Sequence, residues 1–244
     1  MNVVNAGLRS LRRWFRLHPY WMIWGGVGLV YLVFWSWYTG LSPRLNEQEI
    51  RAYMQQMQQA NYNQQALDRL EQFMRTDDGG DFIIVNNLHD RDPDFIAANG
   101  MTAEQAGQEY IDYMLGEITS RGGAPLFLAE VLGPTFDRAG LKQMVAGYST
   151  VTEPESELDQ DLDLWTSVAL MRYRSRRDMM DILIQPGFAE QYPNKGASLV
   201  KTLAIPVRPV ANLADLRLHV AAFLIIVGLL LQLLVVHRRL AGTA

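Results

Sequence analysis

Two long uncharged apolar segments, one near each end, constrain this chain more than any other feature. No Asp, Glu, Lys or Arg occurs between Leu17 and Pro43, and none occurs between Leu218 and Val236. Each segment has about the 20 apolar residues that a helix needs to cross ~30 Å of hydrocarbon. A helix of this length that is apolar all round is rare in a small soluble domain. The sequence therefore predicts two transmembrane helices, over residues 20–39 and 218–237.

The first segment has a second interpretation, a cleaved signal peptide, because basic residues precede it. Its apolar part is too long for a signal sequence, and YTGLSP is a poor cleavage site. Tryptophan and tyrosine lie towards both ends of the segment, as expected at the two headgroup boundaries of a retained anchor. Gly25, Gly26 and Gly28 leave a notch on which another helix can pack closely.

The distribution of charge predicts the orientation in the membrane. The tails, residues 1–19 and 238–244, hold six arginines and no acid, whereas all 26 acidic residues lie between the apolar segments. Basic flanks stay in the cytoplasm. We expect a bacterial inner-membrane protein with both termini cytoplasmic and the central region periplasmic. The chain has no cysteine, so no disulfide supports that region.

The residues that follow the first segment predict a helical linker over 40–77. Asn46 and Glu49 have the spacing of a capping box. Apolar residues then recur at helical spacing from Ile50 to Met57, and a second helical piece ends at the Asp77-Asp78-Gly79-Gly80 run. The glutamines between them also suggest a coiled coil, but the pattern does not sustain heptads. We interpret the segment as a packed or linking helix.

From residue 78 to 207 the pattern changes to strands alternating with helices. Strands are expected over 82–88, 126–133, 166–173 and 198–207. Helix starts are expected at Thr102 and Ser175, and the second helix is expected to stop at Pro186-Gly187. The order β-α-β-β-α-β is that of ferredoxin-like folds and places the domain in the α+β class. A short linker, 208–217, leads to the second apolar segment.

Three stretches carry a resemblance to a known family. They are DGGDFIIVNNLHDRD, EYIDYMLGEITSRGGAPLFLAEVLG and WTSVALMRYRSRRDMMDILIQPGF. With SLVKTLAIPV they resemble the dimeric α+β barrel superfamily, and within it the domain-of-unknown-function family thirteen-thirty. The resemblance implies that two copies pair with their sheets face to face. The flanking apolar segments and the long connection from Pro134 to Asp163 depart from that family.

Within the connection, Glu153 to Asp163 carries an acid at every odd position. The spacing imitates the start of a calcium loop, but Leu164 and Leu170 replace the required Gly and Glu, which excludes an EF-hand. Three interpretations stay open: a solvated acidic loop, a docking surface for a basic partner, and a looser calcium site.

Catalytic motifs are sparse, which argues against an enzyme. The chain lacks GxSxG, HExxH, P-loop and GxGxxG sequences, and three of its four histidines lie at the ends of the apolar segments. We therefore expect no cofactor and no metal. Arg172, Arg174, Arg176 and Arg177 form a basic cluster, but an acidic domain outside the cytoplasm is not a nucleic-acid partner.

The family resemblance implies a ligand cavity between sheet and helices. The candidate residues are Asn86, His89, Tyr110, Arg172 and Tyr173. Three of them also have a possible structural role. Asn86 can cap a strand end, Tyr110 can pack on a helix face, and Arg172 can form an ion pair with an acid.

Two functions follow from the sequence. The first is a membrane-anchored structural or accessory subunit, whose partners are the lipid bilayer and either other membrane subunits or a second copy of the chain. The alternative is a membrane-tethered sensor of small ligands or a cofactor-free, monooxygenase-like enzyme, which rests on fold analogy alone.

Overall fold

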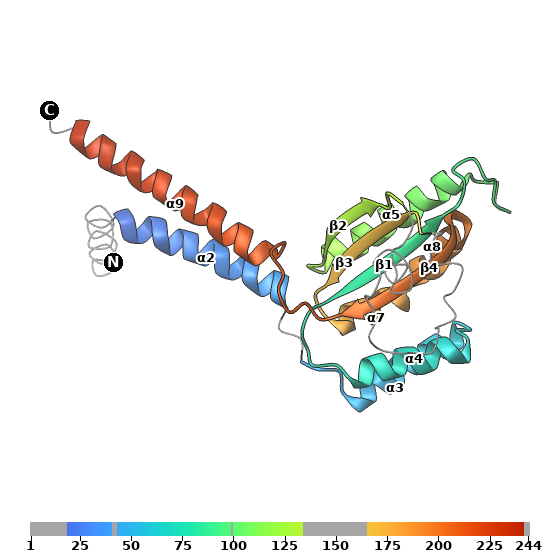
Figure 1. Ribbon diagram of the computed structural model, residues 1–244. Coiled ribbons are helices and arrows are strands. Elements are labelled where there is room, and N and C mark those ends of the chain that lie inside the picture. Colours follow the sequence, from blue (N-terminus) through green and yellow to red (C-terminus); the bar gives the residue numbers. More distant parts are fainter. Residues whose placement is uncertain (1–18, 41–42, 99, 134–164, 242–244) are drawn as a thin grey trace, which may run out of the picture. The chain divides into compact units, whose positions relative to one another are not determined.

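The computed structural model describes residues 19–40, 43–98, 100–133 and 165–241 (Figure 1). The chain forms two compact units. One comprises residues 42–209, and the other joins the two end segments, 1–41 and 210–244. The described residues form seven α-helices and one four-stranded antiparallel sheet, which confirms the α+β class.

The sheet contains β1 (Phe82–Asp90), β2 (Ala124–Glu130), β3 (Ser167–Tyr173) and β4 (Leu199–Val207) in the order β2-β3-β1-β4. Every neighbouring pair is antiparallel. All four strands lie where the alternation of apolar residues predicts them, with no end shifted by more than three residues. The pairing places β1 next to both β3 and β4, so β1 is a central strand.

Three helices lie on one face of the sheet: α5 (Ala103–Ser120), α7 (Arg176–Leu183) and α8 (Pro186–Ser198). In Figure 1 the sheet lies in front of α5 and α8. The Thr102–Gln105 capping box starts α5 as predicted. Gly122 then adopts φ 76°, a conformation that favours glycine, and turns the chain into β2.

The helix that starts after Ser175 ends before Pro186 as predicted, but Pro186 also starts a further helix that the sequence did not predict. α7 ends at Leu183, and Pro186 occupies the first turn of α8. Proline is well suited to that position, since its ring presets φ and its missing N–H has no partner there. The apolar positions alone did not reveal α8.

The core between the sheet and these helices is aromatic and aliphatic. It contains the buried side chains of Phe82, Ile84, Ile118, Tyr173, Ile182 and Phe188. The ring of Phe82 stacks on that of Tyr173, with centroids 5.4 Å apart. Because Phe82 and Ile84 of β1 point into this core, the odd-numbered residues of β1 point to the opposite face.

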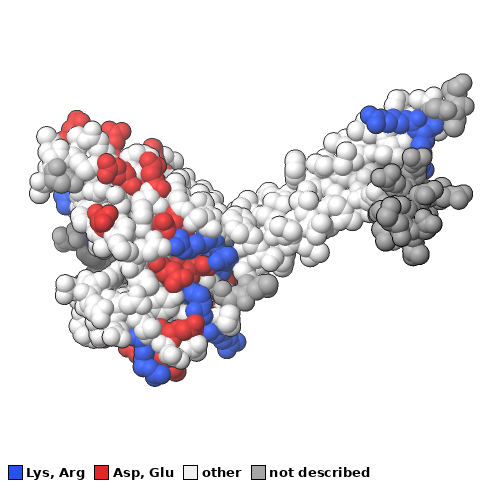
Figure 2. Space-filling view, turned by 180° about the vertical axis from the view of Figure 1, so that it is seen from behind, with Lys and Arg blue, Asp and Glu red and all other residues white. Residues whose placement is uncertain are grey.

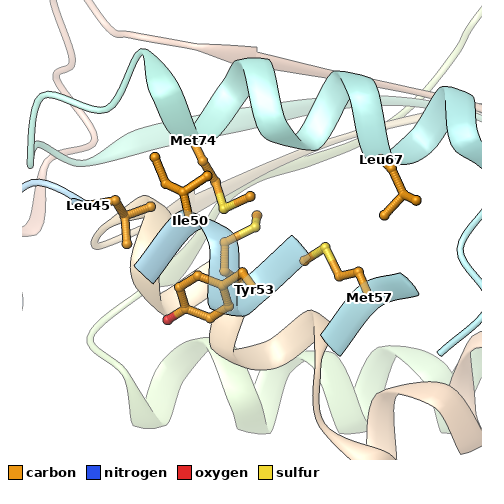
Figure 3. Close-up of a cluster of buried hydrophobic side chains, with 7 residues drawn as sticks. Leu45, Ile50, Tyr53, Met57, Leu67 and Met74 are labelled. Carbon is orange, nitrogen blue, oxygen red and sulfur yellow. The ribbon is translucent and has the colours of Figure 1, made fainter. Parts of the chain in front are cut away.

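The predicted helical linker is a packed hairpin of α3 (Glu47–Gln59) and α4 (Gln64–Arg75). The Asn46–Glu49 capping box forms as predicted. Apolar side chains of both helices form a second core, shown in Figure 3, made of Leu45, Ile50, Tyr53, Met57, Leu67, Met74 and, from α7, Met180. The hairpin therefore packs on α7, outside the helical layer, and its glutamines face solvent.

The second unit pairs α2 (Pro19–Thr39) with α9 (Leu216–Ala241). The Trp24 indole Nε1 donates to the Gln232 side-chain oxygen at 2.9 Å, and the Tyr31 hydroxyl donates to the Arg217 carbonyl at 3.4 Å. Early residues of α2 thus meet late residues of α9, so the helices are antiparallel. Their surface is free of charged side chains between the two ends, as Figure 2 shows for one side.

Among the described helices, only α9 is long and apolar enough to cross a membrane by length and composition, so the prediction of two spans is corrected to one candidate span. α9 is rich in leucine and isoleucine. By contrast, α2 contains four tryptophans, three tyrosines and three glycines among 21 residues. Indole and phenol groups prefer the interface to the hydrocarbon interior, which lowers the mean hydropathy of α2.

Candidate functional site

The sheet divides the five predicted cavity residues between its two faces. Asn86, Tyr110 and Tyr173 lie on the helix-covered side, whereas His89 and Arg172 belong to the opposite face by strand alternation. The structure therefore does not bring all five together. Each group is described by its own contacts.

On the helix-covered side, the candidates are mostly engaged in packing. The Asn86 amide donates to the Ala169 carbonyl of the neighbouring strand at 3.3 Å. Tyr173 is buried against Phe82, and burial raises the pKa of its phenol. Burial, and then the nearby phenol of Tyr173, raises the pKa of Tyr110. Both tyrosines are therefore neutral hydrogen-bonding groups rather than general bases near neutral pH.

Sequence reasoning missed Lys195, which extends to this group from α8. Its ammonium nitrogen lies 5.6 Å from the centroid of the Tyr110 ring. Burial lowers the Lys195 pKa, and Lys195 forms no ion pair with a described residue. The signal that would have located it is Pro186 as a helix start, which places residue 195 on a helix facing α5.

Arg172 has a structural role on the opposite face. Its side chain is 2% exposed, and its Nε and Nη2 atoms each lie 2.8 Å from the Asp81 carboxylate. Its Nη1 atom donates to the Gly122 carbonyl at 2.8 Å. Arg172 thus joins β3 to the start of β1 and to the turn before β2, as the ion-pair alternative predicted.

The other arginines of the predicted basic cluster also form internal contacts. Arg174 pairs with Asp178 at 2.6 Å within the start of α7. Arg177 pairs with Glu49 of α3 at 2.5 Å, and this hydrogen bond lowers the Glu49 pKa. Arg176 lies over the Phe73 ring of α4 at 4.5 Å. The cluster holds the α3–α4 hairpin against α7 rather than forming a free basic patch.

His89 lies within β1, opposite Lys201 of β4 and one residue beyond the predicted end of that strand. Its Nδ1 atom is buried and has no hydrogen-bond partner among the residues that the structure describes. The imidazole is therefore a polar group without a structural role that accounts for it.

The open face of the sheet is largely apolar. Strand alternation places Val85, Leu170, Phe127, Leu203 and Ile205 on it. Phe127 is 53% exposed, Leu203 46% and Ile205 41%. The α3–α4 hairpin does not cover this face, because its core includes α7 and no strand residue.

The predicted helix-packing glycines, Gly25, Gly26 and Gly28, do not contact α9. No atom lies within 4 Å of where a Cβ would stand at any of them. Instead Gly228 of α9 receives the Trp24 ring, whose nearest atom lies 3.0 Å from the position of a Cβ. At these three positions of α2 there is thus open space where a side chain would stand.

Among the described ranges, no group of three or more His, Asp or Glu side chains is placed to hold a metal ion. The acidic stretch Glu153 to Asp163 lies outside the described residues. His219 Nδ1 lies 2.9 Å from the Asp215 carbonyl, one turn earlier at the start of α9.

No protein-family model matches this chain, and no curated protein matches it. Among solved structures, it is similar to a crystal structure of RPA0582, a protein of unknown function from Rhodopseudomonas palustris. That similarity covers 62% of this chain and 96% of the other, at 12% identity and a TM-score of 0.43. The structure of methylated RPA0582 matches over 62% and 93%, at 16% identity and a TM-score of 0.41.

Proposed function

We propose that this chain is a membrane-anchored accessory subunit whose folded domain binds another protein domain through the open face of its sheet. The observation that carries the proposal is the apolar open face, with Phe127, Leu203 and Ile205 each more than two-fifths exposed. Monomeric proteins rarely leave contiguous apolar patches of this kind uncovered. A sheet with helices on one face needs a second layer on the other.

A second copy of the chain is the partner we favour. A two-fold axis lets the same apolar strands face each other, so one surface supplies both halves of the interface. The strand order β2-β3-β1-β4, with α5 and α8 on one face, supports a ferredoxin-like fold. Together with the sequence resemblance, this order supports assignment to the dimeric α+β barrel superfamily.

The anchoring half of the proposal rests on α9. Although α2 is not a candidate span by its own hydropathy, it packs antiparallel along α9 and hydrogen-bonds Gln232, so we infer that it enters the bilayer together with α9. The bond is favourable there, since an unpaired side-chain amide is costly in hydrocarbon. A helical hairpin leaves both termini on one side, and the arginine-rich tails favour the cytoplasm. The domain would then be periplasmic in a bacterial inner membrane.

Disulfide cross-linking in native membranes tests the proposal, and the absence of natural cysteines keeps the background clean. We expect Val85→Cys, on the open face of β1, to give a disulfide-linked homodimer under mild oxidation. Gln108→Cys, exposed on α5 of the covered side, is the matched control and should stay monomeric. A mixed disulfide with one other membrane protein would show that the partner is a different subunit and not a second copy of the chain. Equal, weak cross-linking from both positions would contradict the proposed interface.

A second candidate function, binding of a small ligand by a sensor or monooxygenase-like domain, is favoured by one observation. Lys195 places an ammonium group without an acidic partner over the Tyr110 ring. An unpaired, half-buried cation destabilises the folded state unless a ligand neutralises it. Under this hypothesis, Lys195→Met raises the thermal midpoint of the ligand-free protein and abolishes any stabilisation by small carboxylates.

A further inference from the structure

One end of the open sheet face brings together three basic side chains. His89 of β1 is the direct cross-strand partner of Lys201 in β4. Arg91 follows two residues later, and its N–H still bonds the Ser198 carbonyl next to β4. The register shift near His89 leaves the extra residue, Val200, on β4. The alternation of β1 is therefore intact, so His89 and Arg91 point to the same side.

Lys201 extends over this group. Its ammonium nitrogen lies 5.3 Å from the centroid of the Trp165 ring. Trp165 precedes β3, and β3 and β4 flank β1 on opposite sides. The contact between Lys201 and Trp165 therefore crosses β1 at the level of His89. Arg91 in turn lies over the Phe95 ring at 4.9 Å, so aromatic rings border the basic group on two sides.

Two atoms of this group lack the partners that buried polar atoms normally have. His89 Nδ1 and Arg91 Nε are both buried, and neither has a hydrogen-bond partner in the described part of the chain. The nearest carboxylate along the strand, Asp90, is engaged elsewhere, since it accepts from the Thr166 and Ser167 hydroxyls at 2.6 and 2.8 Å. Most buried polar atoms in native proteins are satisfied, so two orphans in one place indicate a missing acceptor.

We propose that His89 and Arg91, next to Lys201, form a binding site for a small oxyanion, the phosphate or carboxylate group of a ligand. An arginine Nε–H and an imidazole N–H are donors, and an ionised oxygen is the acceptor that makes such bonds shortest and strongest. The Trp165 and Phe95 rings supply apolar walls for the carbon skeleton of the ligand. This site does not depend on whether the rest of the open face pairs with a second copy.

The test uses the full chain, delipidated in a phosphate-free maltoside detergent, titrated calorimetrically with inorganic phosphate and with acetate at constant ionic strength. We expect saturable binding of at least one anion. Arg91→Gln and His89→Gln should each weaken it at least tenfold, whereas Arg69→Gln, an exposed arginine on α4, should leave it unchanged. Binding that is absent from the unmodified chain, or that survives both substitutions, overturns the proposal.

Two further measurements separate a binding role from a structural one and identify the source of the anion. Without ligand, His89→Gln should leave the thermal midpoint unchanged or raise it, because His89 makes no structural hydrogen bond that the substitution would remove. Removal of a structural histidine would instead lower the midpoint, so a fall of several degrees counts against the site. A short-chain soluble phosphatidic acid that binds tenfold tighter than inorganic phosphate would identify a lipid headgroup as the ligand. Equal affinity would identify a free anion. Either result depends on His89 and Arg91.

Discussion

Replacement of Arg172 by methionine distinguishes a structural arginine from a ligand-binding one. Methionine keeps much of the apolar stem while it removes the guanidinium. The Asp81 carboxylate then loses both of its 2.8 Å contacts with Arg172, and the Gly122 carbonyl loses its donor. If the Arg172 guanidinium were instead a ligand-binding group without a partner in the protein, its removal would stabilise the ligand-free protein.

The expected loss follows from the burial of the two partners. Breaking a fully buried ion pair costs about 3–5 kcal/mol. The Arg172 side chain is 2% exposed, but that of Asp81 is 25% exposed and regains some hydration. We therefore expect a loss of about 2–4 kcal/mol in the free energy of unfolding. For a domain of this size, ~3 kcal/mol corresponds to a fall of roughly 6–12 °C in the midpoint.

Urea and thermal unfolding of the full chain in detergent, followed by near-ultraviolet circular dichroism, measures this loss. Arg121→Met is the matched control, because its i,i+4 pair with Glu117 joins only the last turn of α5 to its C-cap and should contribute less than about 1 kcal/mol. In the Arg172→Met background, Asp81→Asn should recover part of the loss by removing the orphaned charge. A change below about 1 kcal/mol for Arg172→Met, or a gain, would refute the reasoning.

Two further predictions concern the helix pair and the buried phenols. Gly228→Leu should disrupt the pairing of α2 with α9, because its side chain meets the Trp24 ring, whereas Gly26→Leu should leave the pairing intact. Cysteine cross-links between the two helices measure the difference. Equal cross-linking in the two variants would contradict the contact between the Trp24 ring and Gly228. The pKa values of Tyr110 and Tyr173 are raised, so these phenols stay neutral in the folded state above pH ~10, where unfolded tyrosine ionises. Domain stability is thus unaffected by these groups below pH ~10 and falls above it. A phenolate absorbance titration in which all tyrosines ionise together, before unfolding, would contradict this.

Local sequence signals determined most of the secondary structure. The capping boxes at Asn46 and Thr102, and the serine cap at Ser175, each set a helix start by satisfying N–H groups within a few residues. Strand positions followed from residue alternation. The helix that was missed after Pro186 is of the same local kind, since Pro-Gly is compatible both with the end of one helix and with the first turn of the next.

The candidate sites were decided by tertiary structure, because they depend on groups far apart in the chain. Sequence placed His89 and Arg172 in one cavity with Tyr110, but strand alternation and register place them on the other face of the sheet. The partner of Arg172 is 91 residues away, and the lysine that meets Tyr110 comes from a helix that the pattern concealed.

The sequence by itself determined which segments are apolar, where the helices start and that the domain is α+β, since these depend on residues close in the chain. Only the tertiary structure decided that the α3–α4 hairpin packs on α7 and leaves the sheet open, and that Gly228 rather than Gly26 receives a helix. Apolar faces specify that burial occurs, but not against which surface. That choice is made by the fit of side chains across the whole fold.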